Sequence, residues 1–326
     1  MPAVIDKPVV AVVEKGVNYI FHLLAVGKVG YDSRYGDRYA RSVAASDLGS
    51  LRRHANLLVF GDGRGFGPLT ALLVFIPAFL NLDTADKLDR YCHGLKAAIG
   101  LGEPERFCSL YDTALAELGD WIEDCLDRTH QAIKHAHADC REPALELCDV
   151  VHRSFLVYDA QVWTEQLPAL TAKALELNAL CAKADIIRRW EEGTGLQYRR
   201  PAFAVSLCSA NANGPDANDL GYDRNVHYSG RTPTDILSFA CHEVGVRLIA
   251  PVRRGLLREL TPAQAQSAYW VNETLAEYLR CSTFGCAPAF AYDHTLYNLF
   301  QQMHRFSPEA SVADLFRAGV EHLGRR

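Results

Sequence analysis

Two adjacent residues in the last third of the chain have the types that a metal site uses. His242 and Glu243 stand together in the segment CHEVGVR (241–247). In a helix with the pattern HExxH, two histidines four residues apart bind zinc from one face, and the glutamate activates the metal-bound water as a general base. Here Val246 occupies the position of the second histidine. The pair alone is a weak signal, because histidine followed by glutamate occurs by chance in many chains.

A second segment, NETLAEY (272–278), adds a candidate ligand thirty residues after Glu243. Together the two segments resemble the active-site helices of the gluzincins, the thermolysin-like clan of zinc metallopeptidases, in which an NExxAEY helix supplies the third ligand. The resemblance covers residues 202–281, including the segments AFAVSLC (202–208) and VHYSG (226–230). It implies a zincin-like domain with His242 and Glu273 as zinc ligands and Glu243 as the catalytic base.

The sequence departs from this clan at one essential ligand. Catalytic zinc usually takes three protein ligands and a water, and valine at position 246 offers no lone pair. Glu243 and Arg247 are four residues apart with the acid on the N-terminal side, which favours a helical ion pair. That pair would engage the base that catalysis needs. Zinc is therefore expected to bind weakly or not at all.

The resemblance also implies residues around the same cleft. His294, in AYDHTLYNLF (291–300), lies in the region where gluzincins carry a residue that stabilises the oxyanion, and Tyr292 and Tyr297 are equal alternatives. Each of the three is also typical of a packing residue. The candidate cleft residues on the two helices are Val246, Arg247, Asn272 and Glu277.

Three functions stay open. The preferred one is a degenerate zincin-like metallopeptidase homologue that lacks ordinary peptidase activity and keeps its cleft for a peptide or protein segment. The second is an active metal-dependent hydrolase with a non-standard ligand such as Glu277. The third is a helical scaffold without an ancestral site, in which His242 is a core histidine and Glu243 forms a structural pair. The first is preferred because strand, capped helix, HE pair and NExxAEY helix occur in the order of the clan.

Two other clusters are weaker. The segment THQAIKHAHADC (129–140) would place some of its histidines on one helical face, which is interpreted as a solvated or partly buried face. These residues are His130, Lys134, His135, His137 and Cys140. The glycines of GDGRGFG (61–67) match neither phosphate-binding pattern, so this segment is interpreted as a flexible connection between helices.

Composition narrows the class of protein. The 326 residues suffice for one large or two modest domains, and a net charge of −5 gives no basic field for nucleic acid or an anionic membrane. The most apolar stretch, residues 66–82, is shorter than a bilayer span and contains Pro68 and Pro77, which predicts a buried helix broken by a loop. Nothing in the sequence indicates an oligomeric state.

Cysteine usage and the N-terminal sequence both favour a cytoplasmic location. The first residues lack the basic and apolar regions of a signal peptide. The ten cysteines are widely and irregularly spaced without a CxxC pair, which predicts reduced and mostly buried thiols rather than disulfides or a structural zinc site.

The element pattern predicts a mainly α fold with a small β component (α+β). Helical periodicity dominates residues 9–190, so residues 1–195 are expected to form a helical region and residues 196–326 the zincin-like domain. Strands are predicted at 202–208 and 225–229, with an exposed loop at 209–222 between them.

Three helices are predicted from their start signals. The segment TPTD (232–235) begins a helix that should end before Pro251. The capping box of Thr261 and Gln264 begins the helix that carries NETLAEY. The segment SPE (307–309) is expected to begin the last helix.

Overall fold

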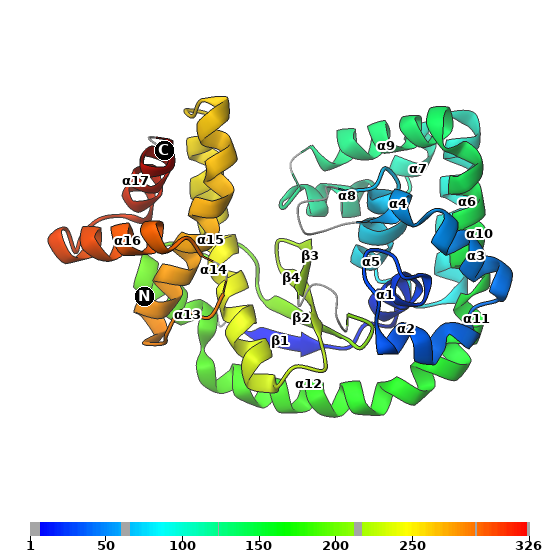
Figure 1. Ribbon diagram of the computed structural model, residues 1–326, viewed down its shortest axis with the longest axis horizontal. Helices are drawn as coiled ribbons and strands as arrows, with labels where there is room; N and C mark the ends of the chain where they lie inside the picture. The colour runs from blue at the N-terminus through cyan, green and yellow to red at the C-terminus, as the bar shows by residue number, and fades with distance from the viewer. Residues whose placement is uncertain (1–6, 60–65, 123, 212–216, 291, 325–326) are drawn as a thin grey trace. The chain divides into compact units, whose positions relative to one another are not determined.

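The predicted fold class is confirmed: the chain is mainly helical with one small four-stranded sheet. The structure is a computed structural model, which describes residues 7–59, 66–122, 124–211, 217–290 and 292–324 (Figure 1). Most of the glycine-rich segment 61–67 lies outside the described residues. Within the described residues, no helix is both long enough and apolar enough to cross a membrane.

The described residues fall into two compact units. The N-terminal unit comprises Ala11–Glu176 and Ala204–Thr232, and the C-terminal unit comprises Met1–Val10, Leu177–Phe203 and Pro233–Arg326. The chain therefore crosses between units at several points. The physical reason is that one of the strands after residue 203 packs against helices of the N-terminal unit.

The N-terminal unit is built from short helices around a buried apolar core. The segment 71–79 is a π-helical turn, Ala71–Phe75, that continues directly into α5, Ile76–Phe79, where a loop break had been predicted. Pro77 is the second residue of α5 and directly follows the π-helical turn. The remaining helices are α1 (Lys15–Gly27), α2 (Arg34–Tyr39), α3 (Ala45–Arg53), α4 (Ala55–Leu58), α6 (Ala85–Leu101), α7 (Pro104–Cys108), α8 (Asp112–Gly119), α9 (Cys125–Asp139), α10 (Arg141–Arg153) and α11 (Phe155–Val157). A 3₁₀ turn, Ala40–Ser42, follows α2.

After α11 the chain forms a second π-helical turn, Tyr158–Trp163, and then α12, Thr164–Ala184, which crosses from the N-terminal into the C-terminal unit. The cluster of histidines on α9 has the expected solvated character. His135 is exposed and pairs with Asp139 at 2.8 Å, and the Nδ1 of His137 bonds the carbonyl of Ile99 at 2.7 Å. The interpretation of this face as solvated or partly buried is confirmed.

The sheet has the strand order β1-β2-β4-β3, with β1 at Val9–Val12, β2 at Phe203–Cys208, β3 at Ala217–Gly221 and β4 at Arg224–Tyr228. β2 and β4, the two predicted strands, pair in parallel. β3 corrects the prediction of a loop at 209–222, because it pairs antiparallel with β4 and buries Leu220. Turn-forming residues are tolerated there since β3 is an edge strand with an irregularity between Asp219 and Gly221.

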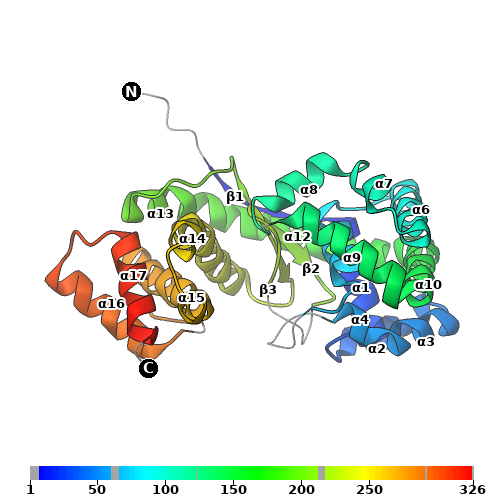
Figure 2. The ribbon, with the colours of Figure 1, turned by 90° about the horizontal axis from the view of Figure 1, so that it is seen from above.

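The C-terminal unit is a group of helices in which α14 packs along α15 (Figures 1 and 2). Its helices are α13 (Ile186–Thr194), α14 (Pro233–Leu257), α15 (Pro262–Phe284), α16 (His294–Phe306) and α17 (Val312–Gly324). α17 packs on α15, and α13 packs on both α14 and α15. The pair α14 and α15 carries every residue of the candidate zinc site and cleft except His294 and its alternatives Tyr292 and Tyr297.

The predicted helix boundaries hold in part. Both halves of the capping box of Thr261 and Gln264 are present at the start of α15. The expected stop at Pro251 is wrong, because α14 continues to Leu257 and buries Leu256 in the extension, which offsets the hydrogen bond lost at proline. Residues 307–310 form a turn instead of a helix start, and the Oγ of Ser311 caps α17 by accepting the amide of Asp314 at 3.2 Å.

Candidate functional site

The HE segment on α14 is positioned by close contact with α13. Gly245 lies so near to the indole of Trp190 that a Cβ at this position would meet the ring at 2.3 Å. The Trp190 Nε1 donates a hydrogen bond of 2.9 Å to the carbonyl of Cys241, one residue before His242. Only glycine leaves room for this contact. Gly245 therefore lets α14 pack closely on α13, and this packing helps to set the position of His242 on α14.

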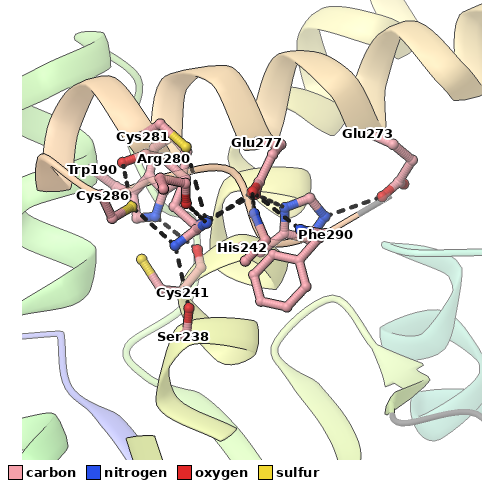
Figure 3. A network of polar contacts seen from close by, with 12 residues as sticks. Trp190, Ser238, Cys241, His242, Glu273, Glu277, Arg280, Cys281, Cys286 and Phe290 are labelled. Atoms are coloured by element: carbon pink, nitrogen blue, oxygen red, sulfur yellow. Dashed lines mark hydrogen bonds and ion pairs between the residues drawn. The ribbon is translucent and has the colours of Figure 1, made fainter. Parts of the chain in front are cut away.

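The structure brings His242 together with Glu273, the two residues that the resemblance pairs as ligands. The Nε2 of His242 lies 3.2 Å from Oε2 of Glu273 (Figure 3). On the other side of the ring, Nδ1 lies 3.2 Å from Oε2 of Glu277. The buried imidazole is therefore held between two carboxylates of α15, four residues apart on one face of that helix. Their role as metal ligands stays a prediction.

The charge state of His242 follows from these contacts. Burial by itself lowers the pKa of an imidazole, but the hydrogen bonds to Glu273 and Glu277 outweigh it and raise the pKa to about 9. Glu243 adds a further favourable charge interaction. Both ring nitrogens therefore carry protons at neutral pH, and each donates to a carboxylate.

Glu277 is the centre of the network, and its second cationic partner is Arg280. The Arg280 guanidinium donates from Nε to Oε2 and from Nη2 to Oε1, both at 2.8 Å. The backbone amides of Ala289 and Phe290 also donate to Oε1, at 2.6 and 3.2 Å. Burial raises the pKa of the Glu277 carboxyl, yet Arg280, His242 and the amide of Ala289 hold it well below its ordinary value.

The remaining donors of Arg280 tie the network to neighbouring segments. Nη1 donates to Oγ of Ser238 at 3.2 Å and to Sγ of Cys286 at 3.0 Å (Figure 3). Nη2 donates to the carbonyl of Ala287 at 3.1 Å. Sequence reasoning missed Arg280. The signal that could have found it is its spacing of three residues from Glu277, the distance at which helical ion pairs form.

An apolar wall closes one side of the imidazole. Phe290 stacks on Phe239 with ring centroids 4.7 Å apart, and its ring centroid is 5.1 Å from that of His242. The Arg280 guanidinium lies over the Phe290 ring at 4.9 Å, a cation–π contact. The aromatic wall and the surrounding charges together immobilise His242.

The predicted ion pair between Glu243 and Arg247 is confirmed: Nη1 of Arg247 donates to Oε2 of Glu243. Arg247 is fully buried and the Glu243 side chain is 13% exposed, so the pair is shielded from water. The guanidinium also lies 5.8 Å from the ring of Phe203. The base of an HExxH site is thus held by a buried cation, and the adjacent Val246 is itself buried.

The other candidate residues lie outside this network. Asn272 is buried, and its Oδ1 accepts no hydrogen bond from the described residues. His294 is exposed at the start of α16, where its ring packs on Tyr292 at 4.7 Å. Tyr297 is buried against Tyr278, with ring centroids 5.4 Å apart. The contacts of the described residues give none of them a place beside His242.

His242 and Glu273 offer a catalytic zinc two of the three protein ligands that it usually takes. Two ligands of one tetrahedral zinc lie about 3.3 Å apart, so the separation of His242 Nε2 and Glu273 Oε2 suits either a shared metal or a hydrogen bond. The third position, however, is the apolar Val246. Among the residues that the structure describes, no set of three or more histidine, cysteine or acidic side chains is arranged to hold a metal ion.

No protein-family model, no curated protein and no solved structure matches this chain. The resemblance to gluzincins therefore stays a prediction from the residues of the two segments.

Proposed function

We propose that this chain is a degenerate zincin-like protein without ordinary peptidase activity, and that its C-terminal unit binds a peptide or protein segment beside Glu273. One observation carries the proposal: Nδ1 of His242 is engaged by Glu277 and only Nε2 faces Glu273, so α14 and α15 offer a metal two protein ligands where a catalytic zinc takes three. Val246 supplies no ligand in its place. The residues of the former site are thus used for structure.

The state of Glu243 supports the loss of hydrolysis. A general base must reach the proton that it removes and must have a free oxygen lone pair aimed at it. The Glu243 carboxylate is bound to the buried Arg247 guanidinium on the same helix. The guanidinium stabilises the ionised carboxylate and so makes Glu243 a weaker base toward a water near His242.

The surface next to Glu273 supports binding. Tyr269 and Trp270, one helical turn before Glu273 on α15, are 55% and 51% exposed and pack edge to face at 5.7 Å. The Glu273 side chain is 19% exposed. An exposed aromatic pair offers apolar surface to a partner and can hold a cation over its rings, and a carboxylate one turn away adds an attraction for cations. The preferred occupant is a peptide segment with a lysine or arginine side chain next to an apolar one.

Selection from a random heptapeptide phage library on the immobilised full chain tests this proposal. Enriched peptides should be basic and should bind Trp270→Ala and Glu273→Gln at least tenfold more weakly than wild type. Phe306→Ala removes a still more exposed aromatic side chain, at 80% against 51% for Trp270, from α16 of the same unit and should bind normally. Failure to enrich any peptide, or equal binding by Trp270→Ala and Phe306→Ala, would contradict the proposal.

The two alternatives give different results in the same assays. A metal-dependent hydrolase would contain near-stoichiometric zinc after purification and would cleave enriched peptides. A helical scaffold would bind neither zinc nor peptide.

The ten free thiols of the chain further support a reducing, cytoplasmic location. Its net charge of −5 supports a partner other than nucleic acid.

A further inference from the structure

The interior of the N-terminal unit contains a polar cluster that is separate from the site described above. It is called here the His22 cluster and comprises side chains from α1, α2, the π-helical turn, α12 and β2: His22, Tyr35, Tyr158, Gln166 and Cys208. Tyr158 packs its ring on His22 at 4.8 Å, and its phenol has Tyr35 and Cys208 as electrostatic neighbours. The residues therefore surround one small region of the core.

The hydrogen bonds of the cluster have a fixed direction. The Ser42 Oγ donates its proton to the carbonyl of Tyr39 at 2.7 Å, so it accepts from Nε2 of His22 at 2.9 Å. Burial lowers the pKa of His22 to about 3, so the ring is neutral and its Nδ1 accepts from the Tyr35 hydroxyl at 3.0 Å. The Tyr35 oxygen in turn accepts from Nε2 of Gln166 at 3.1 Å.

This series of hydrogen bonds ends at an acceptor atom that receives no hydrogen bond from the described residues. The Oε1 of Gln166 is buried without a hydrogen-bond donor, and the Tyr158 hydroxyl is buried without any partner. The direction of these hydrogen bonds assigns Nε2 of Gln166 as the atom that donates to Tyr35, so the other amide atom is the oxygen Oε1. A partner of Oε1 must therefore be a hydrogen-bond donor. A buried polar atom without a hydrogen-bond partner is destabilising, so we expect a donor to be bound at Oε1 of Gln166.

The sheet side of the same region adds further polar atoms. Ser206 and Cys208 point to the same face of β2 because side chains alternate along a strand. The Ser206 Oγ and both amide atoms of Asn211 are also buried without partners, and the backbone amide of Asn211 bonds the Cys208 thiol. Tyr158 itself begins a π-helical turn, a distortion that is frequent at functional sites.

We propose that the His22 cluster binds a small neutral molecule with a hydroxyl or amide group, which donates to Oε1 of Gln166 and bonds the Tyr158 hydroxyl. The ligand is neutral because no charged side chain belongs to the cluster, and burying an ion without a counter-charge is very unfavourable. The acid beside it in sequence, Asp159, is paired with Lys15 at 2.8 Å.

Mass spectrometry of the small molecules released from the purified full chain tests this inference. The chain is exchanged into volatile buffer and precipitated with methanol, and the supernatant is analysed for compounds present at about one equivalent per protein. Tyr158→Phe removes only the hydroxyl and Gln166→Met only the amide, and each should retain at least tenfold less compound. Tyr91→Phe is the matched control, because it removes a buried hydroxyl of the same unit that is already bonded to the Leu72 carbonyl.

The expected wild-type extract contains one neutral compound with an N–H or O–H donor, and Tyr91→Phe retains it. Circular dichroism of each variant shows whether it is folded before extraction. An extract without such a compound overturns the inference, as does a charged compound or one without a donor. Equal retention by Tyr158→Phe and wild type also overturns it. Ordered water as the sole occupant is the result expected if the inference is wrong, and Tyr158→Phe would then not lose any ligand.

Discussion

The Nδ1 of His242 lies 3.2 Å from Oε2 of Glu277, and this carboxylate is fully buried between the imidazolium and the Arg280 guanidinium. Two cations therefore share one buried anion on α15, and Glu273 supplies a second carboxylate on the far side of the ring. Such a network is costly to break, because removing one member leaves an unpaired buried charge. It accounts for the fixed position of His242 without a metal.

The stability of the chain should depend on the protonation of His242. Its folded pKa of about 9 lies above the ordinary value of 6.5, so its contribution is fully present below about pH 6.5 and is lost as pH rises through about 9. The shift corresponds to on the order of 3 kcal/mol. Melting temperatures of wild type and His242→Gln, measured from pH 6 to 10, should converge at the alkaline end. Parallel curves would show that the imidazole is neutral when folded.

Arg280→Met should be strongly destabilising because it leaves Glu277 with one cation instead of two and frees the carbonyl of Ala287. Loss of one partner of a buried ion pair costs about 3–5 kcal/mol. Arg188→Met is the control, since Arg188 forms exposed pairs with Asp185 and Glu192 in the same unit and should change little. Urea unfolding measures both, and equal midpoints for the two variants would refute a structural role for Arg280.

Two glycines of α14 should respond to alanine in opposite directions. Gly245→Ala forces a methyl group against the Trp190 indole and should destabilise the chain by about 1–3 kcal/mol. Gly255→Ala meets nothing within 4 Å and should stabilise the helix by up to about 1 kcal/mol. Thermal unfolding of both variants checks the packing of α13 on α14. A neutral Gly245→Ala would mean that this contact is looser than described.

The pair of Glu243 and Arg247 should be energetically coupled. Arg247→Met leaves a shielded carboxylate without its cation, which costs on the order of a few kcal/mol, and adding Glu243→Gln should recover part of that loss. A double-mutant cycle in urea is expected to give a coupling of about 1–3 kcal/mol. Strict additivity of the two single changes would show that the pair contributes only packing.

Local signals predicted much of the fold. The capping box at Thr261, the proline at position 233 and the alternation in β2 and β4 act within a few residues, and each marks its element correctly. β3 was not predicted because its Asn and Asp residues favour turns, and it is a strand only because it pairs with β4. α14 also continues beyond Pro251, because burial of Leu256 in the following turns offsets the hydrogen bond lost at the proline. The local sequence around Pro251 does not predict that burial.

Only the contacts between residues of the two motif segments could be predicted from the sequence. The spacing of the HE pair and NETLAEY indicated that His242 and Glu273 would meet, and the four-residue spacing indicated the Glu243–Arg247 pair. The Glu277 contacts depend on Gly285, whose φ of 64° turns the chain back so that the amides of Ala289 and Phe290 reach the carboxylate. Periodicity within one helix contains no information on such a return.

Zinc titration of wild type and Val246→His tests the central claim, that this site lacks one ligand and is held together by ion pairs. Val246 lies one turn after His242 on α14, so a histidine there would complete a set with His242 and Glu273. Isothermal titration at pH 7 should show negligible or weak binding to wild type and binding at least a hundredfold tighter to Val246→His, because a third protein ligand completes a tetrahedral site with one open position. Peptidase activity need not return, since Arg247 still holds Glu243. Equal weak binding by both proteins would mean that the three positions do not converge, and a tight site already present in wild type would contradict the account.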